Sequence, residues 1–137
     1  MDLGLKGKSA IVTGGSRGIG LAIAKGFAQE GVNVSICARS EGPLSSAVTS
    51  LGDYGNIVHS MICDVSDPVA LHDYIETAHS ALGSLDILVN NPSGFGRTDD
   101  EAGWKMSIDI DLMASVRGCW SAIPLIENSG GGSIIHI

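Results

Sequence analysis

The sequence predicts an α/β fold in which a doubly wound parallel sheet carries helices on both faces. Short apolar segments alternate along the chain with longer segments of helical period, and this alternation is typical of strand–helix–strand units. Some short segments are almost continuously apolar, as at residues 87–89, which is expected of strands covered on both faces. These observations predict a single domain over residues 1–137, with strand order 3-2-1-4-5.

Five strands are expected at the short apolar segments. They cover residues 9–13, 33–38, 56–63, 86–90 and 133–137. The first helix is expected at 18–30, where Ile19, Ile23 and Phe27 lie four residues apart and predict a buried stripe. Gly31 then stands where a left-handed cap would end that helix.

Two further helices are expected on the strength of their first residues. Residues 43–51 begin with Pro43, whose missing N–H costs little at a helix start. Residues 67–82 begin with Asp67 as the cap, followed by Pro68 at the first helical position.

A long amphipathic segment is expected at residues 101–128, with acidic residues 99–101 at its positive N-terminal end. Pro124 is expected to kink this helix or to end its regular part. Ser129 and the three glycines after it reverse the chain into the last strand. No repeat, charge block or linker marks a domain boundary.

The composition excludes several classes of partner. The net charge is −7 and only eight residues are Lys or Arg, which argues against nucleic acid or an acidic membrane surface. No stretch approaches the roughly 18 apolar residues of a membrane span. The first residues lack the pattern of a secretory signal, so a cytoplasmic protein is expected. Cys37, Cys63 and Cys119 lack disulfide or zinc spacing and are interpreted as small buried hydrophobes.

The strongest motif is the turn between the first strand and the first helix, where residues 13–20 read Thr-Gly-Gly-Ser-Arg-Gly-Ile-Gly. Gly14 permits a tight turn, Gly18 lets the backbone approach a pyrophosphate, and Gly20 lets the helix pack closely against the sheet. The N–H groups at the helix start would face the phosphates. The expected cofactor-binding residues of this loop are Gly14, Ser16, Arg17, Gly18, Ile19 and Gly20. The alternative is a glycine-rich turn that holds no ligand.

At these residues the chain resembles the short-chain dehydrogenase/reductase family, whose nucleotide loop has the same Gly-x3-Gly-x-Gly spacing. Other motifs of the family follow in the same order. Asp64 and Val65 resemble its adenine-contacting pair, and Asn90 and Asn91 resemble the end of its fourth strand. Trp104 resembles the residue that opens its long helix. The resemblance covers essentially the whole chain. Among family members it is most similar to the 3-oxoacyl carrier-protein reductases, which implies a Rossmann fold and hydride transfer between a nicotinamide and a carbonyl or alcohol substrate.

The end of the second strand indicates which cofactor is preferred. Selectivity for NAD(H) usually comes from an Asp or Glu at this place, which here holds Arg39. Together with Arg17, its guanidinium could bind a 2′-phosphate, so NADP(H) is expected in preference to NAD(H). Two solvated surface arginines are the alternative, and Glu41 lies close enough to oppose a phosphate.

The resemblance also implies catalytic residues that residues 1–137 do not contain. The family uses a serine after the fifth strand and then Tyr-x-x-x-Lys, whereas the only tyrosines, Tyr54 and Tyr74, have no Lys four residues later. The family's catalytic asparagine is replaced by Asp111, which is expected to face the sheet and to give a slower or retuned proton relay. The Asn-Asn-Ala-Gly of the family is also altered at Pro92 and Ser93.

Three interpretations of function remain open on the sequence. The first is the cofactor-binding half of a longer NADP(H)-dependent oxidoreductase, inactive alone and homo-oligomeric only as the longer chain. The second is a non-catalytic NADP(H)-binding module, complete at this length. The third and weakest is an interaction domain whose glycine loop holds no ligand. No metal is expected, because His72, Glu76 and His79 share a helix face that is more simply a solvated one.

Overall fold

A computed structural model describes residues 1–137 and contains one parallel sheet of five strands in the order β3-β2-β1-β4-β5. The strands are β1 (Ser9–Val12), β2 (Asn33–Ala38), β3 (Val58–Ile62), β4 (Ile87–Asn90) and β5 (Ser133–His136). Every neighbouring pair is parallel. The predicted fold class, the five strands and their order are therefore confirmed, and β5 lies at one edge of the sheet.

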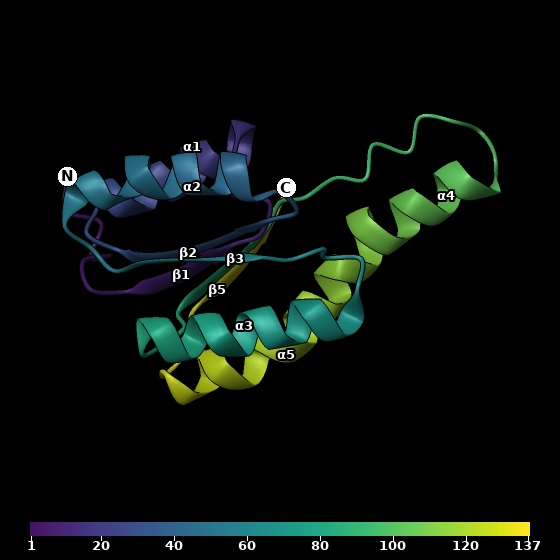
Figure 1. Cartoon of the computed structure of the whole chain (residues 1–137). Coiled ribbons are helices and arrows are strands. Elements are labelled where there is room, and N and C mark those ends of the chain that lie inside the picture. The colour runs from purple at the N-terminus through teal and green to yellow at the C-terminus, as the bar shows by residue number, and fades with distance from the viewer.

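Helices cover both faces of the sheet (Figure 1). They are α1 (Gly18–Gln29), α2 (Glu41–Leu51), α3 (Pro68–Leu82), α4 (Glu101–Ser107) and α5 (Ala114–Asn128), with short helices η1 (Gly52–Tyr54) and η2 (Ile108–Met113). Figure 1 shows α1 and α2 on one face and α3 and α5 on the other, while α4 projects beyond the sheet. No helix is both long and apolar enough to cross a membrane.

Each face of the sheet has its own apolar core. Val12, Val34 and Ile36 pack with α1 and α2 on one side. Ile11 and Leu88 pack with α3 and α5 on the other side. Alternate residues of a strand thus enter opposite cores, as the period of two requires. The strands read as continuous apolar runs because both of their faces are buried.

The helix ends follow the predicted cap chemistry. The carboxylate of Asp67 accepts hydrogen bonds from the N–H groups of Val69 and Ala70, at 2.9 and 3.1 Å, so the predicted cap of α3 is confirmed. Gly31 has φ +81°, the left-handed conformation expected after α1. Helix α2 begins two residues before Pro43, which still lies in the first turn and needs no intrahelical partner there.

The predicted stripe of α1 is present in part. Ile23 and Phe27 are half-buried and pack against the core, beside the buried Gly20, Ala24 and Ala28. Ile19 is 63% exposed, so the prediction was wrong for this residue, because the first turn of α1 borders a cavity and not the sheet. Small residues on the sheet side let the helix lie close to the strands.

The predicted long helix is present, but its middle turn is a π-helix. Helices α4 and α5 are joined without a break by η2, in which each N–H reaches five residues back. This part of the helix extends beyond the sheet (Figure 1), so Asp111, like Ile108 on the same predicted face, is exposed and does not face the sheet as expected. Pro124 lies inside α5, which continues to Asn128, so the proline does not end the helix.

Candidate functional site

A cavity of about 670 Å³ lies where the parallel strands end at their carboxyl termini. This is the edge at which α/β sheets bind nucleotides. It is bordered by the glycine turn after β1, the segments after β2 and β3, and the loop after β4. The lining residues are Gly14, Ser16, Arg17, Gly18, Ile19, Cys37, Ala38, Arg39, Ser40, Pro43, Cys63, Asp64, Val65, Asn91, Pro92, Ser93, Phe95, Ile110 and Ile137.

The glycine turn depends on left-handed backbone at two glycines and on a close approach at a third. Gly14 and Gly18 have φ +64° and +55°, in the left-handed region that favours glycine. A Cβ at Gly20 would lie 2.3 Å from the carbonyl oxygen of Gly14 and 2.5 Å from the side-chain nitrogen of Asn91. Gly20 therefore lets α1 approach the turn itself, which refines the predicted packing against the sheet.

Asn91 holds the turn from the neighbouring strand. Its side-chain N–H group donates to the carbonyl oxygens of Thr13 and Gly14 at 3.3 and 3.0 Å, while its backbone N–H donates to the Thr13 hydroxyl at 3.2 Å. These bonds tie the ends of β1 and β4 together below the cavity. The first N–H groups of α1 have no partner within the helix and face the cavity, where an anion would satisfy them.

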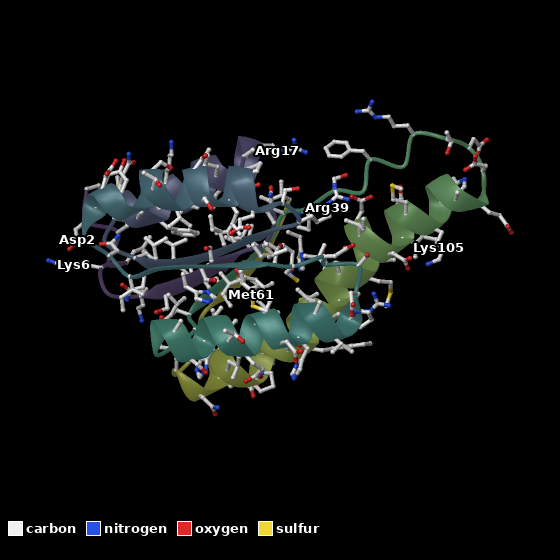
Figure 2. The ribbon with its side chains drawn as sticks, in the orientation of Figure 1. Asp2, Lys6, Arg17, Arg39, Met61 and Lys105 are labelled. Atoms are coloured by element: carbon white, nitrogen blue, oxygen red, sulfur yellow. The ribbon has the colours of Figure 1, made fainter.

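Two cations border the cavity without forming an ion pair. The chain's ion pairs are Lys8 with Asp86 and Lys105 with Asp109, so Arg17 and Arg39 are in neither. Figure 2 shows both arginines at the same end of the sheet, far from Lys6 at the opposite end. Unpaired guanidinium groups beside a cavity can bind a phosphate.

The start of α2 adds further donors beside Arg39. Ser40 caps this helix, yet its hydroxyl makes no hydrogen bond to the helix backbone. Ser40 and Pro43 line the cavity, whereas Glu41 does not. The lining of the cavity thus includes a free hydroxyl, the N-terminus of α2 and two arginines.

Asp64 lies on the wall after β3. The hydroxyl and N–H of Ser66 donate to its carboxylate at 2.7 and 3.0 Å. These hydrogen bonds lower the pKa of Asp64, and the nearby charge of Arg39 lowers it further. The group is therefore an ionised acceptor beside Val65, next to the expected adenosine position.

The cavity brings together most of the residues expected to bind the cofactor. Nine of them line it: Gly14, Ser16, Arg17, Gly18, Ile19, Arg39, Asp64, Val65 and Asn91. Gly20 does not line the cavity, but it lies directly against the turn at Gly14. Asn90 lies outside the wall, because its buried side chain faces α5 and β5, where it contacts His136 at 3.3 Å. Sequence reasoning missed Ser40 and Pro43, although the end of β2 and the start of a helix could have placed them there.

The far end of the cavity is formed by the loop after β4. The carboxylate of Asp111 accepts a hydrogen bond from the N–H of Gly94 at 3.2 Å. A Cβ at Gly94 would lie 2.9 Å from the carbonyl oxygen of Met106, so the loop lies directly against the helix. Asp111 therefore fixes a loop whose Ser93 and Phe95 border the cavity.

The histidines of α3 do not build a metal site. No group of three or more His, Cys, Asp or Glu side chains in residues 1–137 is placed to hold a metal ion. The ring of His72 instead lies 3.0 Å from the hydroxyl of Ser121 in α5.

The chain is similar to known dehydrogenases and reductases over nearly all of its length. It is 43% identical over 136 residues to a protein of Streptomyces violaceoruber named as a ketoacyl reductase of the granaticin polyketide synthase, covering 93% of this chain and 49% of that protein. It is 35% identical over 138 residues to dehydrogenase/reductase SDR family member 4 of Oryctolagus cuniculus, covering 97% and 53%. The chain thus spans about half the length of these relatives.

Solved structures show the same fold. L-sorbose reductase from Gluconobacter frateurii, complexed with NADPH and L-sorbose, is 39% identical with a TM-score of 0.93, covering 99% of this chain and 54% of that one. An NAD⁺-bound xylitol dehydrogenase is 23% identical with a TM-score of 0.90, over 96% and 53%, and it supports the fold alone. The family model described as short chain dehydrogenase matches residues 8–137. The chain belongs to the short-chain dehydrogenase/reductase family of oxidoreductases.

Proposed function

We propose that this chain binds NADP(H) and forms the cofactor half of an oxidoreductase that transfers hydride between the nicotinamide and a carbonyl or alcohol substrate. The observation that carries the proposal is the pair of unpaired arginines, Arg17 and Arg39, beside the free hydroxyl of Ser40. A 2′-phosphate is the part of NADP(H) that NAD(H) lacks, and arginine suits it because the guanidinium can bind two oxygens at once.

The rest of the cavity would hold the shared parts of the nucleotide. The pyrophosphate would bind at the glycine turn and at the N-terminus of α1. Asp64 and Val65 would border the adenine, and Asn91 with the loop after β4 would border the nicotinamide. The nicotinamide supplies the hydride, while the residues of this chain bind and orient it. The similar L-sorbose reductase is complexed with NADPH, which supports the same choice of cofactor.

Substituting Arg39 tests the choice of cofactor. Arg39→Ala should raise the Kd for NADPH about tenfold or more, because a charge-assisted bond contributes about 1.5–3 kcal/mol, while the Kd for NADH stays unchanged. Calorimetric titration of both cofactors measures this. Lys6→Ala, which removes one positive charge at the opposite end of the sheet, is the control and should change neither value. Equal losses for NADPH and NADH would overturn the phosphate role.

A non-catalytic NADP(H)-binding module is the second candidate. It is favoured by Asp111 in the place of the family asparagine. The reading frame beyond residue 137 separates the two candidates. A serine followed by Tyr-x-x-x-Lys there supports the oxidoreductase, and a stop codon supports the module. If the chain is instead an interaction domain whose glycine loop holds no ligand, neither NADPH nor NADH should bind saturably.

For the complete oxidoreductase we propose that Asp111 retunes the proton relay. The carboxylate adds negative charge near the site of the missing lysine and tyrosine, and it fixes the loop at Gly94. In the full-length protein, Asp111→Asn should change both the activity and its pH profile. An unchanged profile would contradict the relay, whereas a changed KM with an unchanged profile would leave Asp111 as a residue that only positions the loop.

We also propose a homo-oligomer for the longer chain, formed through the helices that begin near Trp104. Trp104, Leu112 and Trp120 are 61%, 56% and 68% exposed, and large apolar side chains on one helical segment favour association. Sedimentation of the full-length protein should show more than one copy, and Trp120→Glu should shift it towards the monomer.

A further inference from the structure

The wall of the cavity contains two thiols that the proposed function does not use. Cys37, in β2, and Cys63, just after β3, are 1% and 3% exposed and both border the cavity. They belong to the same core cluster, on the side of the sheet that faces α3. The N–H of Cys63 donates to the carbonyl oxygen of Ala38 at 3.0 Å. In the register of β2 and β3, Cys37 lies opposite Met61, two residues before Cys63, so the two cysteines are diagonal neighbours on one face of the sheet, at the expected adenosine end.

The two thiols differ in how easily they ionise. The adjacent thiol of Cys37 lowers the pKa of Cys63, and this outweighs burial and the charges of Asp64 and Asp67, which raise it. The thiol of Cys63 and burial both raise the pKa of Cys37 well above its ordinary value. One member of the pair is therefore the better nucleophile, while the other keeps its proton.

Polar groups continue behind the thiols into the protein. The buried hydroxyl of Tyr74 lies beside Cys37, where its hydrogen bond acts to lower the pKa of that thiol against the larger opposing effects. It also lies 2.9 Å from the hydroxyl of Ser35, which is 2.9 Å from the ring of His59. The thiol pair thus lies between the cavity and a row of hydrogen-bonding side chains, and this differs from the purely apolar packing expected of small buried cysteines.

We propose that Cys37 and Cys63 form an oxidation site in the wall of the nucleotide cavity, where a peroxide converts the two thiols into a disulfide that weakens NADP(H) binding. This inference rests on the proposed function. The Cys63 thiolate attacks hydrogen peroxide, so that an S–O bond forms, the O–O bond breaks and hydroxide leaves. The Cys37 sulfur then attacks the sulfenic acid, so that an S–S bond forms and water leaves with the Cys37 proton. Two thiols and one peroxide thus give one disulfide and two waters.

The positions of the two cysteines explain the effect on binding. Arg39 comes two residues after Cys37, and Asp64 comes directly after Cys63. Joining the sulfurs would draw these two segments together and displace the groups expected to hold the adenosine and its phosphate. A bound nucleotide would in turn cover the thiols, so NADP(H) should protect them from peroxide.

Peroxide treatment of the whole chain tests the proposal. We expect a Cys37–Cys63 link in the mass spectrum of the unreduced peptides, and a Kd for NADPH raised at least tenfold and restored by dithiothreitol. Saturating NADPH should slow oxidation at least tenfold. Cys63→Ala should make the Kd insensitive to peroxide, whereas Cys119→Ala, which removes the thiol outside the cavity, should respond like the unmodified chain.

Two outcomes would overturn the proposal: unmodified Cys37 and Cys63 after treatment, or a linked pair with an unchanged Kd. The protection experiment uses the unmodified chain, so it stands even if Cys63→Ala fails to fold. Failure of the proposed function looks different, because the untreated chain would then bind no NADPH. The mass spectrum would still report whether the two thiols react as a pair.

Discussion

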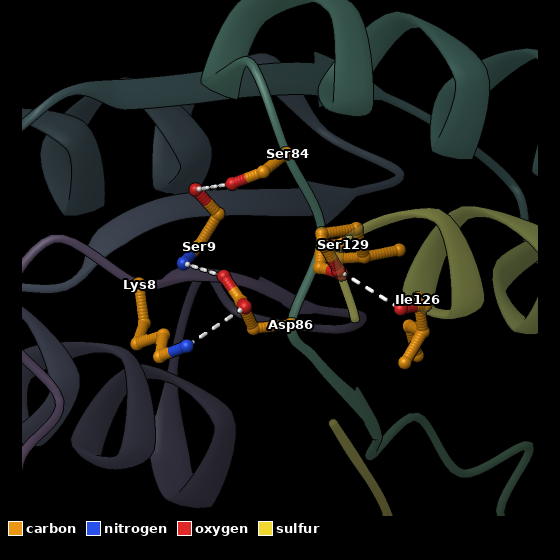
Figure 3. Close-up of polar contacts among 7 residues, drawn as sticks. Lys8, Ser9, Ser84, Asp86, Ile126 and Ser129 are labelled. Carbon is orange, nitrogen blue, oxygen red and sulfur yellow. Dashed lines mark hydrogen bonds and ion pairs between the residues drawn. The ribbon is translucent and has the colours of Figure 1, made fainter. Parts of the chain in front are cut away.

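The two ends of the sheet use polar groups in opposite ways. At the amino end, the carboxylate of Asp86 accepts from the N–H of Ser9 at 2.9 Å and from Lys8 at 3.3 Å, and Ser84 donates to the hydroxyl of Ser9 at 3.1 Å (Figure 3). At the carboxyl end, Arg17 and Arg39 form no ion pair. Polar groups that satisfy one another stabilise the fold, whereas groups left open beside a cavity are available to a ligand.

Gly20→Ala should have the largest effect of the variants, on the glycine turn at the carboxyl end of the sheet. The added methyl group would meet the backbone of Gly14 and the amide of Asn91, and neither can move without opening the turn. Urea unfolding should show a loss of about 2–3 kcal/mol, as for overpacked sites, and calorimetry should show loss of NADPH binding.

Gly26→Ala is the matched control in the same helix. A Cβ there meets nothing within 4 Å, so stability should rise by about 0.5–1 kcal/mol through the gain in helix propensity. Equal stability and equal NADPH affinity in Gly20→Ala and the unmodified chain would contradict the geometry of the turn.

Asp86→Ala should destabilise the amino end of the sheet without changing the nucleotide cavity at the carboxyl end. It leaves the buried N–H of Ser9 without its acceptor, which costs about 1–3 kcal/mol of the free energy of unfolding. Asp86→Asn keeps an acceptor and should lose less. The Kd for NADPH should stay unchanged in both variants, measured where they remain folded. A large change in that Kd would mean that the two ends are not independent.

Ser66→Ala should have the smallest effect, and one that depends on pH. The hydrogen bond from the Ser66 hydroxyl, which the variant removes, is the largest cause that lowers the pKa of Asp64 in the folded state, while the backbone N–H of residue 66 remains. The stability that this gives is present above the ordinary pKa of Asp and is lost as the pH falls through the folded pKa. The variant should therefore differ from the unmodified chain near neutral pH and converge with it in acid.

Urea unfolding across this pH range measures the effect. Ser46→Ala is the control, because its hydroxyl bonds only to the carbonyl oxygen of Gly42, and its difference from the unmodified chain should not vary with pH. A Ser66→Ala difference that is equally constant would exclude the link to Asp64.

The sequence is sufficient to predict the sheet and the glycine turn because both follow from local rules. Apolar runs of strand length give the strands, and glycines at fixed spacing give the turn. The same reasoning wrongly assigns Ile19 to the core. The spacing of apolar residues does not show what each side chain faces, and the side chain of Ile19 faces the cavity.

The surroundings of Asp111 could not be predicted for a different reason. The helical period assigns Asp111 to the same face as Ile108, but it does not show that this part of the helix extends beyond the sheet, where Ile108 is itself 47% exposed. The contact between Asp111 and Gly94 also joins residues 17 positions apart, and only the folded loop brings them together. The same holds for Cys37 and Cys63, which spacing alone does not pair.

An amide-resolved NMR titration with NADPH shows whether the nucleotide binds at the carboxyl end of the sheet. We expect saturable shifts at residues 14–20, at Arg39 and at Asp64, stronger with NADPH than with NADH at Arg39, and none around Ser9 and Asp86. Shifts that do not saturate, or that appear at the amino end of the sheet, would contradict this binding site.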